Sequence, residues 1–574
     1  MLCASRVPSF QSGHGTTKPI NRYPDTVDSV KIVALGGVGE IGKNCAVVEQ
    51  GDDIVVIDCG LSFPNEEMLG IDIIVPDFTY LLQNKERVRG IFLTHAHEDH
   101  IGALPYLLKQ MNVPIHCSEF THALIRHKLD ERCPSVKVDY RIFKPGEVIR
   151  AGGLSVEPIR VTHSIPENCA MAIKTVHGYV LFTGDFKFDF TPVDGKLSDM
   201  KRFSEIGAEG VVVLLSDSTN VERPGWGPSE SIVTEGLRKV FNEAKGRVLL
   251  TTFASNIHRM QQVFQIAKET GRKVAVVGRS MERNLDICMR LGYVKIPNGV
   301  LLPLDDIRGL PDHQVALLTT GSQGEPMSAL VKMSKAEYGR MQVKEGDTLI
   351  YSARPIPGNE GAIWRTINRL FLQGCQVVYE AARPIHVSGH AYQEELKMMI
   401  NLTQPFYVAP VHGEPRHQFV YNKIAEDMGY PEHRRFTLTS GVPLVIEDTK
   451  AFLGDEIPTG RVLVDNSGTP GVTDSVLRDR YNLANDGLVI VSIAVDSTHG
   501  EIVGDPSLHA KGFHGPAGIL EETHDIMVDM LASLTPNDLK DLNKVKQAAT
   551  EIVRKTIVKR AQLRPLIVPS VIEV

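Results

Sequence analysis

The 574-residue sequence has few cysteines, no long apolar run and no excess of positive charge. Its eight cysteines include no C-x-x-C pair, which argues against a disulfide scaffold, a zinc ribbon or a thioredoxin-like motif and favours a reducing compartment. No run of about 18 apolar residues occurs, so we expect no membrane span. The net charge of -7 excludes a globally basic nucleic-acid coat, although a local basic channel is compatible with it.

The composition that remains is that of an ordinary globular protein, with 42% hydrophobic and 23% charged residues. At about 150 residues per domain, the length predicts roughly three to four domains. Residues 1–28 are polar, are rich in Ser, Thr, Gly and Pro, and lack the apolar core of a secretory signal. We expect them to form a flexible N-terminal tail, and we expect the protein to be cytoplasmic.

The pattern along the chain predicts one domain inserted inside another. From Val30 onward, short β-branched runs separated by Gly and Asp turns indicate strands of a layered α/β domain. Alternating strands and helices then indicate a parallel sheet with helices on both faces, after which strand-rich sequence returns. A helix near 519–533 and a longer one from about 536, with Thr535 as N-cap, indicate a further α/β unit. We expect a first domain over 29–220 and 386–465, an insertion over 221–385, a linker over 466–484 and a C-terminal domain over 485–574.

A glycine-rich segment near the start imitates nucleotide-binding motifs. Gly37, Gly39 and Gly42 spell G-x-G-x-x-G, and the segment up to Lys43 resembles a P-loop. A P-loop needs Ser or Thr after the lysine, where this sequence has Asn44, and both motifs must begin a helix. The following residues instead indicate a hairpin of strands. We therefore interpret the motif as a turn between strands, with backbone close to a substrate as a further option.

The strongest chemical signal is THAHEDH at residues 94–100, directly after the apolar run GIFL. His95, His97, Asp99 and His100 are four potential ligands at the end of an expected strand, and imidazole and carboxylate groups suit Zn²⁺ and Mn²⁺. His95 and His97 are two residues apart, so an extended segment points them the same way. Asp99 and His100 can then turn to a second metal. A solvated polar loop is the alternative.

Three more candidate ligands follow expected strands. His163 follows VEPIRVT, Asp185 follows YVLFTG, and His412 follows VAPV. Each alone is compatible with an ordinary loop residue. Ligands for one site should gather at one edge of a sheet, so the repeated position favours a shared metal centre.

Together these motifs resemble a known family. HAHEDH with a later His, a later Asp and a final His resembles the metallo-β-lactamase fold. The insertion, with DSTN at Asp217, HVSGH at 386–390 and VHGE at His412, resembles the β-CASP branch of nucleic-acid nucleases. With FPNEEMLGID, GSQGEP and a C-terminal α/β module, the sequence is similar to the bacterial ribonuclease J family over nearly the whole chain except the tail.

The resemblance implies a metallo-β-lactamase αββα sandwich with an inserted β-CASP parallel α/β domain and a small C-terminal α/β domain. It also implies two divalent ions per subunit, Zn or Mn. By motif, the first ion is expected at His95, His97 and His163, and the second at Asp99, His100 and His412, with Asp185 bridging the two. Every one of these positions is present, so nothing in the sequence suggests an inactive enzyme.

The activity implied by the resemblance is hydrolysis of RNA, 5′→3′ from 5′-monophosphate ends and also internally, in RNA maturation and mRNA decay. We assign catalysis to Asp99, His390 and Asp217. His390 is expected to protonate the departing 3′ oxygen, oriented by the Asp217 carboxylate, which favours the protonated ring. A phosphate anchor without proton transfer is the alternative role for His390.

The HVSGH segment is also the expected pocket for the 5′-monophosphate of single-stranded RNA. Its hydroxyl, ring and backbone N–H groups suit a phosphate. Ser322, in the GSQGE loop, is expected to border the same cleft, although a plain turn is equally compatible. The expected pocket residues are His386, Val387, Ser388, Gly389, His390 and Ser322.

Other polar residues carry weaker expectations. Arg259, Arg279, Arg354 and Arg383 are candidates for an RNA-lining surface, with ordinary solvated arginines as the alternative. The basic residues of 544–560 fit the outer face of an amphipathic helix better than an RNA-facing one. The family implies that this C-terminal module supports a homodimer or tetramer.

Asp72 and Asp465 are weak candidates for a structural Ca²⁺, with turn residues as the favoured interpretation. Two other classes of function stay open. One is a small-molecule metallohydrolase of esters or lactams, against which the insertion and HVSGH argue. The other is a metal-free scaffold subunit of an RNA-decay complex, against which the intact ligand set argues. The sequence does not identify protein partners, natural RNA targets or the working metal.

Overall fold

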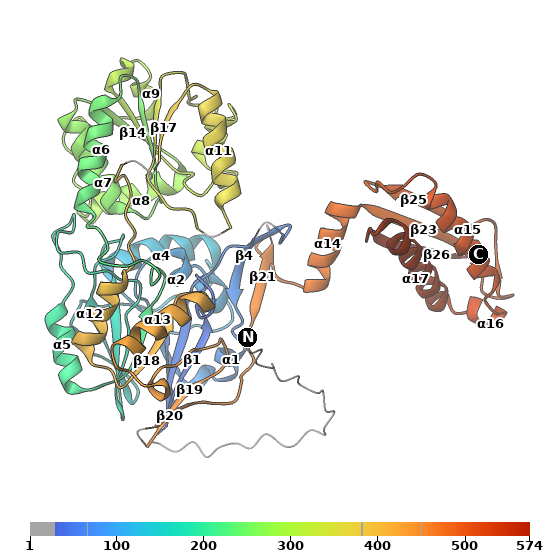
Figure 1. Cartoon of the computed structure of the whole chain (residues 1–574), viewed down its shortest axis with the longest axis horizontal. Helices are drawn as coiled ribbons and strands as arrows, with labels where there is room; N and C mark the ends of the chain where they lie inside the picture. The colour runs from blue at the N-terminus through green and yellow to red at the C-terminus, as the bar shows by residue number, and fades with distance from the viewer. Residues whose placement is uncertain (1–28, 66, 357, 380–382, 449, 466) are drawn as a thin grey trace, which may run out of the picture.

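A computed structural model describes residues 29–574 apart from 66, 357, 380–382, 449 and 466. The expected tail over residues 1–28 lies outside the described residues. Figure 1 shows a two-sheet sandwich, a separate α/β domain above it, and a small domain at the end of an extended arm. Within the described part, the strands form sheets of eight, six, five, three and four strands, with one further strand added to the last.

Two sheets form the sandwich. The first contains β1 (Val30–Gly36), β2 (Cys45–Gln50), β3 (Asp53–Ile57), β5 (Val88–Phe92), β6 (Ile115–Cys117), β7 (Tyr140–Ile142), β19 (Leu444–Glu447) and β20 (Lys450–Leu453). The second contains β8 (Ile149–Ala151), β9 (Leu154–Arg160), β10 (Cys169–Thr175), β11 (Gly178–Phe182), β12 (Val211–Asp217) and β18 (Tyr407–Val411). Their orders are β20-β19-β1-β2-β3-β5-β6-β7 and β18-β12-β11-β10-β9-β8.

The sandwich core follows from alternation along the strands. In β1, Ile32 packs between the sheets with Phe92 and Met171, whereas Val33 and Leu35 point to the outer helices. This period of two is what a strand imposes on its side chains. Each sheet therefore buries one face against the other sheet and the opposite face under helices.

Helices cover both outer faces. Those over the first sheet are α1 (Thr79–Gln83), α2 (Glu98–Ile101), α3 (Leu104–Leu108) and α4 (Glu119–Arg132), with the 3₁₀ turn η1 (Lys85–Arg87). Those over the second sheet are α5 (Met200–Glu209), α12 (Gln393–Thr403) and α13 (Pro415–Asp427), followed by η3 (Glu432–Arg434). Phe203 and Met399 bury against Leu214 of β12, which shows how the outer layer is held. The αββα sandwich predicted above is confirmed.

The inserted domain is a five-stranded parallel sheet of order β14-β15-β13-β16-β17. Its strands are β13 (Val248–Thr251), β14 (Lys273–Val277), β15 (Val315–Thr319), β16 (Thr348–Tyr351) and β17 (Gln376–Val378). The helices on one face are α6 (Ser231–Glu243), α7 (Ile257–Glu269) and α8 (Arg279–Arg290); on the other are α9 (Leu304–Ile307), α10 (Ala329–Ser334) and α11 (Glu360–Leu372), with η2 (Asp312–Gln314) before β15. The predicted parallel sheet with helices on both faces is therefore confirmed.

After the insertion the chain returns to the sandwich. β18 pairs in parallel with β12, the last strand before the insertion, so Asp217 lies directly opposite Val411. The chain thus leaves the sandwich after β12 and returns to it at the neighbouring strand β18. Both strands have their carboxyl ends at the same edge of the sheet, where Asp217 and His412 lie. The residue numbers proposed above for the domain boundaries stay a prediction.

Beyond the sandwich strands, the chain adds β21 (Arg461–Asp465) and β22 (Pro470–Val472). These two strands form a small sheet with β4 (Ile71–Pro76) from the first part of the chain. Helix α14 (Asp474–Asp486) buries none of its residues and links the sandwich to the last domain. In Figure 1 this helix forms the arm. Arg480 fastens it by donating to the carbonyl oxygens of Leu69 and Gly70 at 3.0 and 3.2 Å.

The last domain contains β23 (Leu488–Asp496), β24 (Glu501–Ile502), β25 (Ser507–Lys511) and β26 (Leu566–Glu573), with α15 (Ile519–Ala532), α16 (Pro536–Leu539) and α17 (Leu542–Ala561). The Thr535 N-cap is confirmed, but the long helix expected from 536 is interrupted. Asp541 caps a new helix by accepting from the N–H groups of Asn543 and Lys544, so α16 ends before α17 begins. The expectation that α17 is amphipathic is met, because Val545, Ala549 and Val553 are buried and Lys555 pairs with Glu551.

Two expectations from composition can be compared with the described residues. None of the helices there is both long and apolar enough to cross a bilayer. The seven cysteines in the described part are buried and form no disulfide with one another.

Candidate metal centre and active site

The histidine-rich segment lies between β5 and α2, at the carboxyl end of a buried strand. His97 has an extended backbone and is the N-cap residue of α2. His95 and His97 therefore precede the helix, whereas Asp99 and His100 lie in its first turn. His95 is fully buried, and His100 is nearly so.

Four residues bring ligand atoms together in a first group. His95, His97, His163 and Asp185 each offer one atom, and these atoms all lie within 4.8 Å of one another. Nδ1 of His97 is 3.0 Å from Nε2 of His95 and 3.2 Å from Nε2 of His163. Nε2 of His95 and Nε2 of His163 each lie 3.7 Å from Oδ2 of Asp185. Three imidazoles and a carboxylate form a donor set suited to zinc and similar metals.

A second group contains Asp99, His100, His412 and the same Asp185. Oδ2 of Asp185 lies 3.3 Å from Nε2 of His100, and Oδ1 of Asp185 lies 2.7 Å from Nδ1 of His412. Oδ2 of Asp99 lies 3.6 Å from Nε2 of His100 and 3.2 Å from Nε2 of His412. Asp185 belongs to both groups, so its carboxylate lies between them.

The electrostatics differ between the two groups. Burial lowers the pKa of His95 and of His163 well below the usual range, and lowers the pKa of His97 to about 4. These rings are neutral near neutral pH and keep the lone pair that a metal ligand needs. Burial also opposes a charge on His412, but the Asp185 carboxylate outweighs it and raises the pKa of His412 to about 10. The second group thus holds its carboxylates beside rings that favour positive charge.

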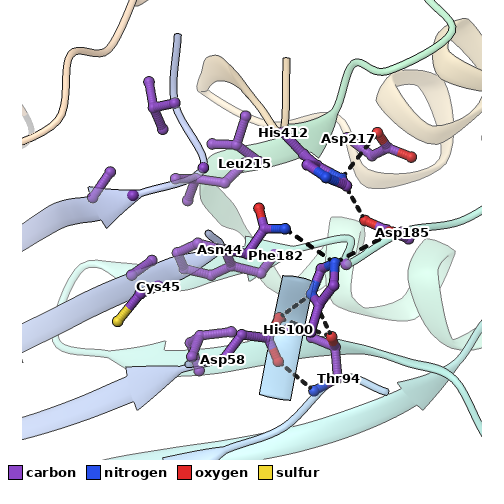
Figure 2. A pocket seen from close by; sticks show the side chains of 18 of the residues that line it. Asn44, Cys45, Asp58, Thr94, His100, Phe182, Asp185, Leu215, Asp217 and His412 are labelled. Atoms are coloured by element: carbon purple, nitrogen blue, oxygen red, sulfur yellow. Dashed lines mark hydrogen bonds and ion pairs between the residues drawn. The ribbon is translucent and has the colours of Figure 1, made fainter. Parts of the chain in front are cut away.

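Asp58 supports the second group and was not among the residues predicted from the sequence. Its Oδ2 accepts from the Thr94 hydroxyl at 2.8 Å and lies 2.7 Å from Nδ1 of His100, while its Oδ1 accepts from the Thr94 N–H at 2.8 Å. Figure 2 shows this contact below His100 and the Asp185 contact above it. A carboxylate behind a histidine fixes the ring tautomer and leaves the other nitrogen for a metal. The available signal was the position of Asp58 just after β3, the same strand-end position that the other ligands share.

Close backbone approach holds the loops of the second group together. A Cβ on Gly60 would lie 1.6 Å from the carbonyl oxygen of Asp99, so only glycine fits there. Asn44 N donates to that same Asp99 oxygen at 2.9 Å. His412 has a φ of 50°, a left-handed conformation that is uncommon for a residue with a side chain, and its N–H donates to Gly37 O at 2.7 Å. The glycine motif is thus a turn between β1 and β2 that supports the ligand loops.

His390 and Asp217 lie beside both groups. Nδ1 of His390 is 2.8 Å from Oδ2 of Asp217, and its Nε2 is 4.0 Å from Oδ2 of Asp185. Burial opposes a charge on His390, but the Asp217 and Asp185 carboxylates outweigh it and raise the pKa of His390. Asp217 is buried at the end of β12, whereas the His390 side chain is 20% exposed. The ring is therefore oriented by a fixed carboxylate and still accessible.

The rest of the HVSGH segment packs on the first group. The carbonyl oxygen of Gly389 lies 2.8 Å from Nδ1 of His163, and a Cβ on Gly389 would lie 2.5 Å from that nitrogen. Val387 is buried, and Ser388 is half-buried. His386 has a buried Nδ1 with no hydrogen-bond partner among the described residues, and burial holds the pKa of this ring well below the usual range.

Three residues named from the sequence lie outside these groups. Ser322 is 1% exposed, and its carbonyl accepts from the Tyr351 hydroxyl. Oδ1 of Asp465 accepts from the N–H groups of Ser467 and Thr469 at 3.0 and 3.2 Å, as a turn residue does. Neither Asp72 nor Asp465 belongs to a group of potential metal ligands within the described part of the chain.

The expectation that Arg259 lines an RNA surface is wrong. Its side chain is fully buried, pairs with Glu230 and donates to the Ile385 carbonyl at 2.7 Å. Position at the start of a helix does not reveal burial, and a buried guanidinium needs a carboxylate partner. Arg279 is exposed, and Arg383 pairs with Glu243.

Divalent cations fit the residues present. Nε2 of His412 is buried without a hydrogen-bond partner among the described residues, although it faces the Asp99 carboxylate. The neutral rings of His95, His97 and His163 turn nitrogens toward one another at hydrogen-bond distance. Buried polar atoms normally have partners, and a bound cation would supply one to each of these nitrogens.

The sandwich and its ligand groups define the class. The chain matches the model of the metallo-beta-lactamase superfamily over residues 38–221 and that of the Zn-dependent metallo-hydrolase RNA specificity domain over 376–432. The model named Ribonuclease J, beta-CASP domain matches 245–370, and the Ribonuclease J C-terminal domain matches 475–574. The fold and site are those of a metal-binding hydrolase of the metallo-β-lactamase superfamily with a β-CASP insertion.

Individual relatives narrow the class. The chain is 38% identical to Ribonuclease J2 of Bacillus subtilis over 550 residues, 95% of this chain and 99% of that protein. It is 40% identical to Ribonuclease J of Thermus thermophilus over 95% of this chain and 96% of that protein, and 43% identical to Ribonuclease J of Synechocystis over 84% and 76%. The chain belongs to the ribonuclease J family. It is a metal-dependent ribonuclease.

A solved structure supports the fold alone. The chain is similar to a protein of unknown function from Enterococcus faecalis V583, with a TM-score of 0.53 and 18% identity. That likeness covers 73% of this chain and all of the other. The predicted family, fold class and enzyme class are confirmed, and the small-molecule and scaffold alternatives are not supported by any of these relatives.

Proposed function

We propose that His95, His97 and His163 hold one divalent cation, that Asp99, His100 and His412 hold a second, and that Asp185 is shared. The observation that carries this proposal is the convergence of these seven side chains into two groups with one residue in common. The donor set suits both Zn²⁺ and Mn²⁺. Two such cations, when bound, lower the pKa of water and stabilise charge on phosphoryl oxygens.

His390 is the proposed proton donor to the departing 3′ oxygen. Oδ2 of Asp217 lies 2.8 Å from Nδ1 of His390, and this contact turns the opposite ring nitrogen, Nε2, toward Asp185. The partial exposure of the ring leaves room for a substrate beside it. A ring fixed by one nitrogen and open at the other is arranged for proton transfer. The proposed catalytic residues are Asp99, Asp217 and His390.

The proposed substrate is single-stranded RNA with a 5′-monophosphate, cut from that end and also internally, in RNA maturation and mRNA decay in the cytoplasm. We propose His386–His390 as the pocket for the 5′ phosphate, and the contact of Gly389 with His163 of the first ligand group supports this position. Ser322 is a weaker candidate for this pocket, because its side chain is almost fully buried. We do not extend the proposal to a structural Ca²⁺, because Asp465 is occupied by its own turn.

A homodimer, or a tetramer, is proposed to form through the C-terminal domain. Val489, Val491, Ile493 and Val495 of β23 are buried under the helices. The opposite face of the sheet carries Ile490 beside Val568 and Ala494 beside Ile572, and Val568 and Ile572 are 41% and 55% exposed. Exposed apolar side chains on this face, interrupted by Ser492 beside Ser570, support a protein contact there.

The test is a time course on RNA that carries a 5′-monophosphate and a label at one end. Metal-stripped protein would be supplied with Zn²⁺ or Mn²⁺ in separate reactions. Mononucleotides released from the start indicate exonuclease action, and internal fragments indicate endonuclease action. Absence of both products with either metal, under conditions in which the protein binds two cations, would contradict the proposal.

A further inference from the structure

The hydroxyl oxygen of Ser388 accepts two hydrogen bonds. Nδ2 of Asn220 donates to Ser388 Oγ at 2.7 Å, and the backbone N–H of His390 donates to the same oxygen at 3.2 Å. Asn220 is the last residue of the DSTN segment, which begins with Asp217, the last residue of β12. Two other residues of the segment also contact the site. Asp217 contacts His390, and the Thr219 hydroxyl donates to the carbonyl oxygen of His412 at 2.9 Å.

The direction of these hydrogen bonds is fixed by chemistry. Nδ2 of Asn220 also contacts the carbonyl oxygen of His390 at 3.2 Å. A carbonyl oxygen only accepts, so the amide atom that faces it must be the NH₂ group and not the oxygen. A backbone N–H only donates. Ser388 Oγ therefore accepts from both neighbours, and a hydroxyl oxygen has two acceptor positions and one hydrogen.

With both acceptor positions occupied, the hydrogen of the Ser388 hydroxyl must point to a third group. None of the hydrogen bonds found among the described residues uses it as donor. The segment around it is held still, since Lys187 Nζ donates to the Ser388 carbonyl oxygen at 3.4 Å and Gly389 rests on His163. The side chain is half-buried, so the hydrogen is available to an incoming acceptor.

We propose that Asn220 is a positioning residue that commits the Ser388 hydroxyl to donate to a non-bridging phosphate oxygen at the 5′ end of the RNA. This inference rests on the proposed function, because it assumes that the HVSGH segment receives the 5′ phosphate. A hydrogen bond to an ionised phosphate oxygen is charge-assisted and roughly twice as strong as one to the neutral oxygen of a 5′-hydroxyl. The preset direction of the Ser388 hydroxyl therefore favours 5′-monophosphate over 5′-hydroxyl RNA.

The test reverses the polarity of one hydrogen bond. In Asn220→Asp an acceptor faces Ser388, so the hydroxyl turns its hydrogen to residue 220 and presents no donor to the phosphate. The measurement is kcat/KM for two RNAs of the same sequence, one with a 5′-monophosphate and one with a 5′-hydroxyl. We expect the ratio of the two values to fall about 10- to 100-fold in Asn220→Asp, mainly through KM, which is the value of one hydrogen bond to a charged group. Ser388→Ala should lower the ratio to a similar degree.

A new negative charge at residue 220 would repel a phosphate without any role for Ser388, and the double variant separates the two explanations. In the Ser388→Ala background, Asn220→Asp should change the ratio by less than about twofold if it acts through the hydroxyl. An additive loss in the double variant would overturn the inference. Asn220→Gln retains an NH₂ group and should keep more of the ratio than Asn220→Asp. Asn485→Asp makes the same chemical change on the exposed arm helix and should leave the ratio unaltered.

The outcomes also separate this inference from the function on which it rests. A wild-type protein that cuts both RNAs equally would remove the proposed end preference, and the inference with it. A wild-type preference that Asn220→Asp leaves intact, in a variant with unchanged metal content and melting temperature, would remove the inference alone.

Discussion

The Asp58→Asn substitution tests how the second cation is held. Asp58 is 4% exposed and its two oxygens serve three donors, two on Thr94 and one on His100. The substitution changes one oxygen to NH₂ with almost no change in volume. It therefore alters hydrogen bonding behind the proposed ligand His100 without changing that residue.

Each orientation of the new amide loses an interaction. If NH₂ replaces Oδ2, it faces Nδ1 of His100, which must then accept, so the ring proton moves to Nε2, the nitrogen turned toward Asp185. If NH₂ replaces Oδ1, it opposes the backbone N–H of Thr94. Either loss is worth about 1.5–3 kcal/mol for a hydrogen bond to a charged group. Loss of such an outer partner lowers metal affinity by about 10- to 100-fold.

The assay is equilibrium dialysis against Mn²⁺ or Zn²⁺ followed by measurement of metal bound per chain. Asp58→Asn should retain the cation of the first group and bind the second about 10- to 100-fold more weakly. Excess metal should restore part of the activity. Asp53→Asn is the matched control, because Asp53 begins β3, the strand that Asp58 follows, and accepts from Arg89 and Gly153 without contact to a candidate ligand. Two cations bound by Asp58→Asn with wild-type affinity would refute the reasoning.

Four further predictions follow from the same geometry. His390→Gln should retain both cations and lower kcat by about 10²- to 10⁴-fold, and full turnover in RNA cleavage would argue against proton donation. Chelation should lower the free energy of unfolding by about 2.7 kcal/mol per site relative to protein with metal at 100 times its Kd, so an unchanged denaturation midpoint would contradict binding at these residues. Gly60→Ala should cost about 1–3 kcal/mol and release the second cation, whereas Gly339→Ala, with open space around it, should do neither. Ile572→Asp should shift sedimentation toward the monomer, whereas Phe419→Asp, at a residue that is even more exposed but lies on the sandwich, should not.

The convergence of the candidate ligands was predictable from sequence, because spacing and position at strand ends carry that information. His95 and His97 belong to one short segment, and His163, Asp185 and His412 each follow an apolar run, so one sheet edge was the natural meeting place. The two-layer fold followed from the same alternating runs. Asp185 in both ligand groups agrees with the arrangement that the family resemblance implied.

The supporting contacts were not predictable, because they depend on which strands become neighbours. Asp58 reaches His100 only because β3 and β5 pair in parallel. Asn220 reaches Ser388 only because the chain returns to the sandwich beside its point of departure. For Arg259 the sequence predicted a surface role that the structure contradicts. A charged residue at the start of a helix is expected to be exposed, but Arg259 is buried and pairs with Glu230.

The order of the chain delays completion of the site during synthesis. Asp185 completes the first ligand group, but His412 reaches the second only after the whole inserted domain has been made and β18 has joined β12. Because domains fold as they leave the ribosome, at most the first of the two ligand groups can be complete until His412 has been made. If RNA cleavage needs both groups, as proposed above, the enzyme stays inactive until well over half of its 574 residues have been synthesised.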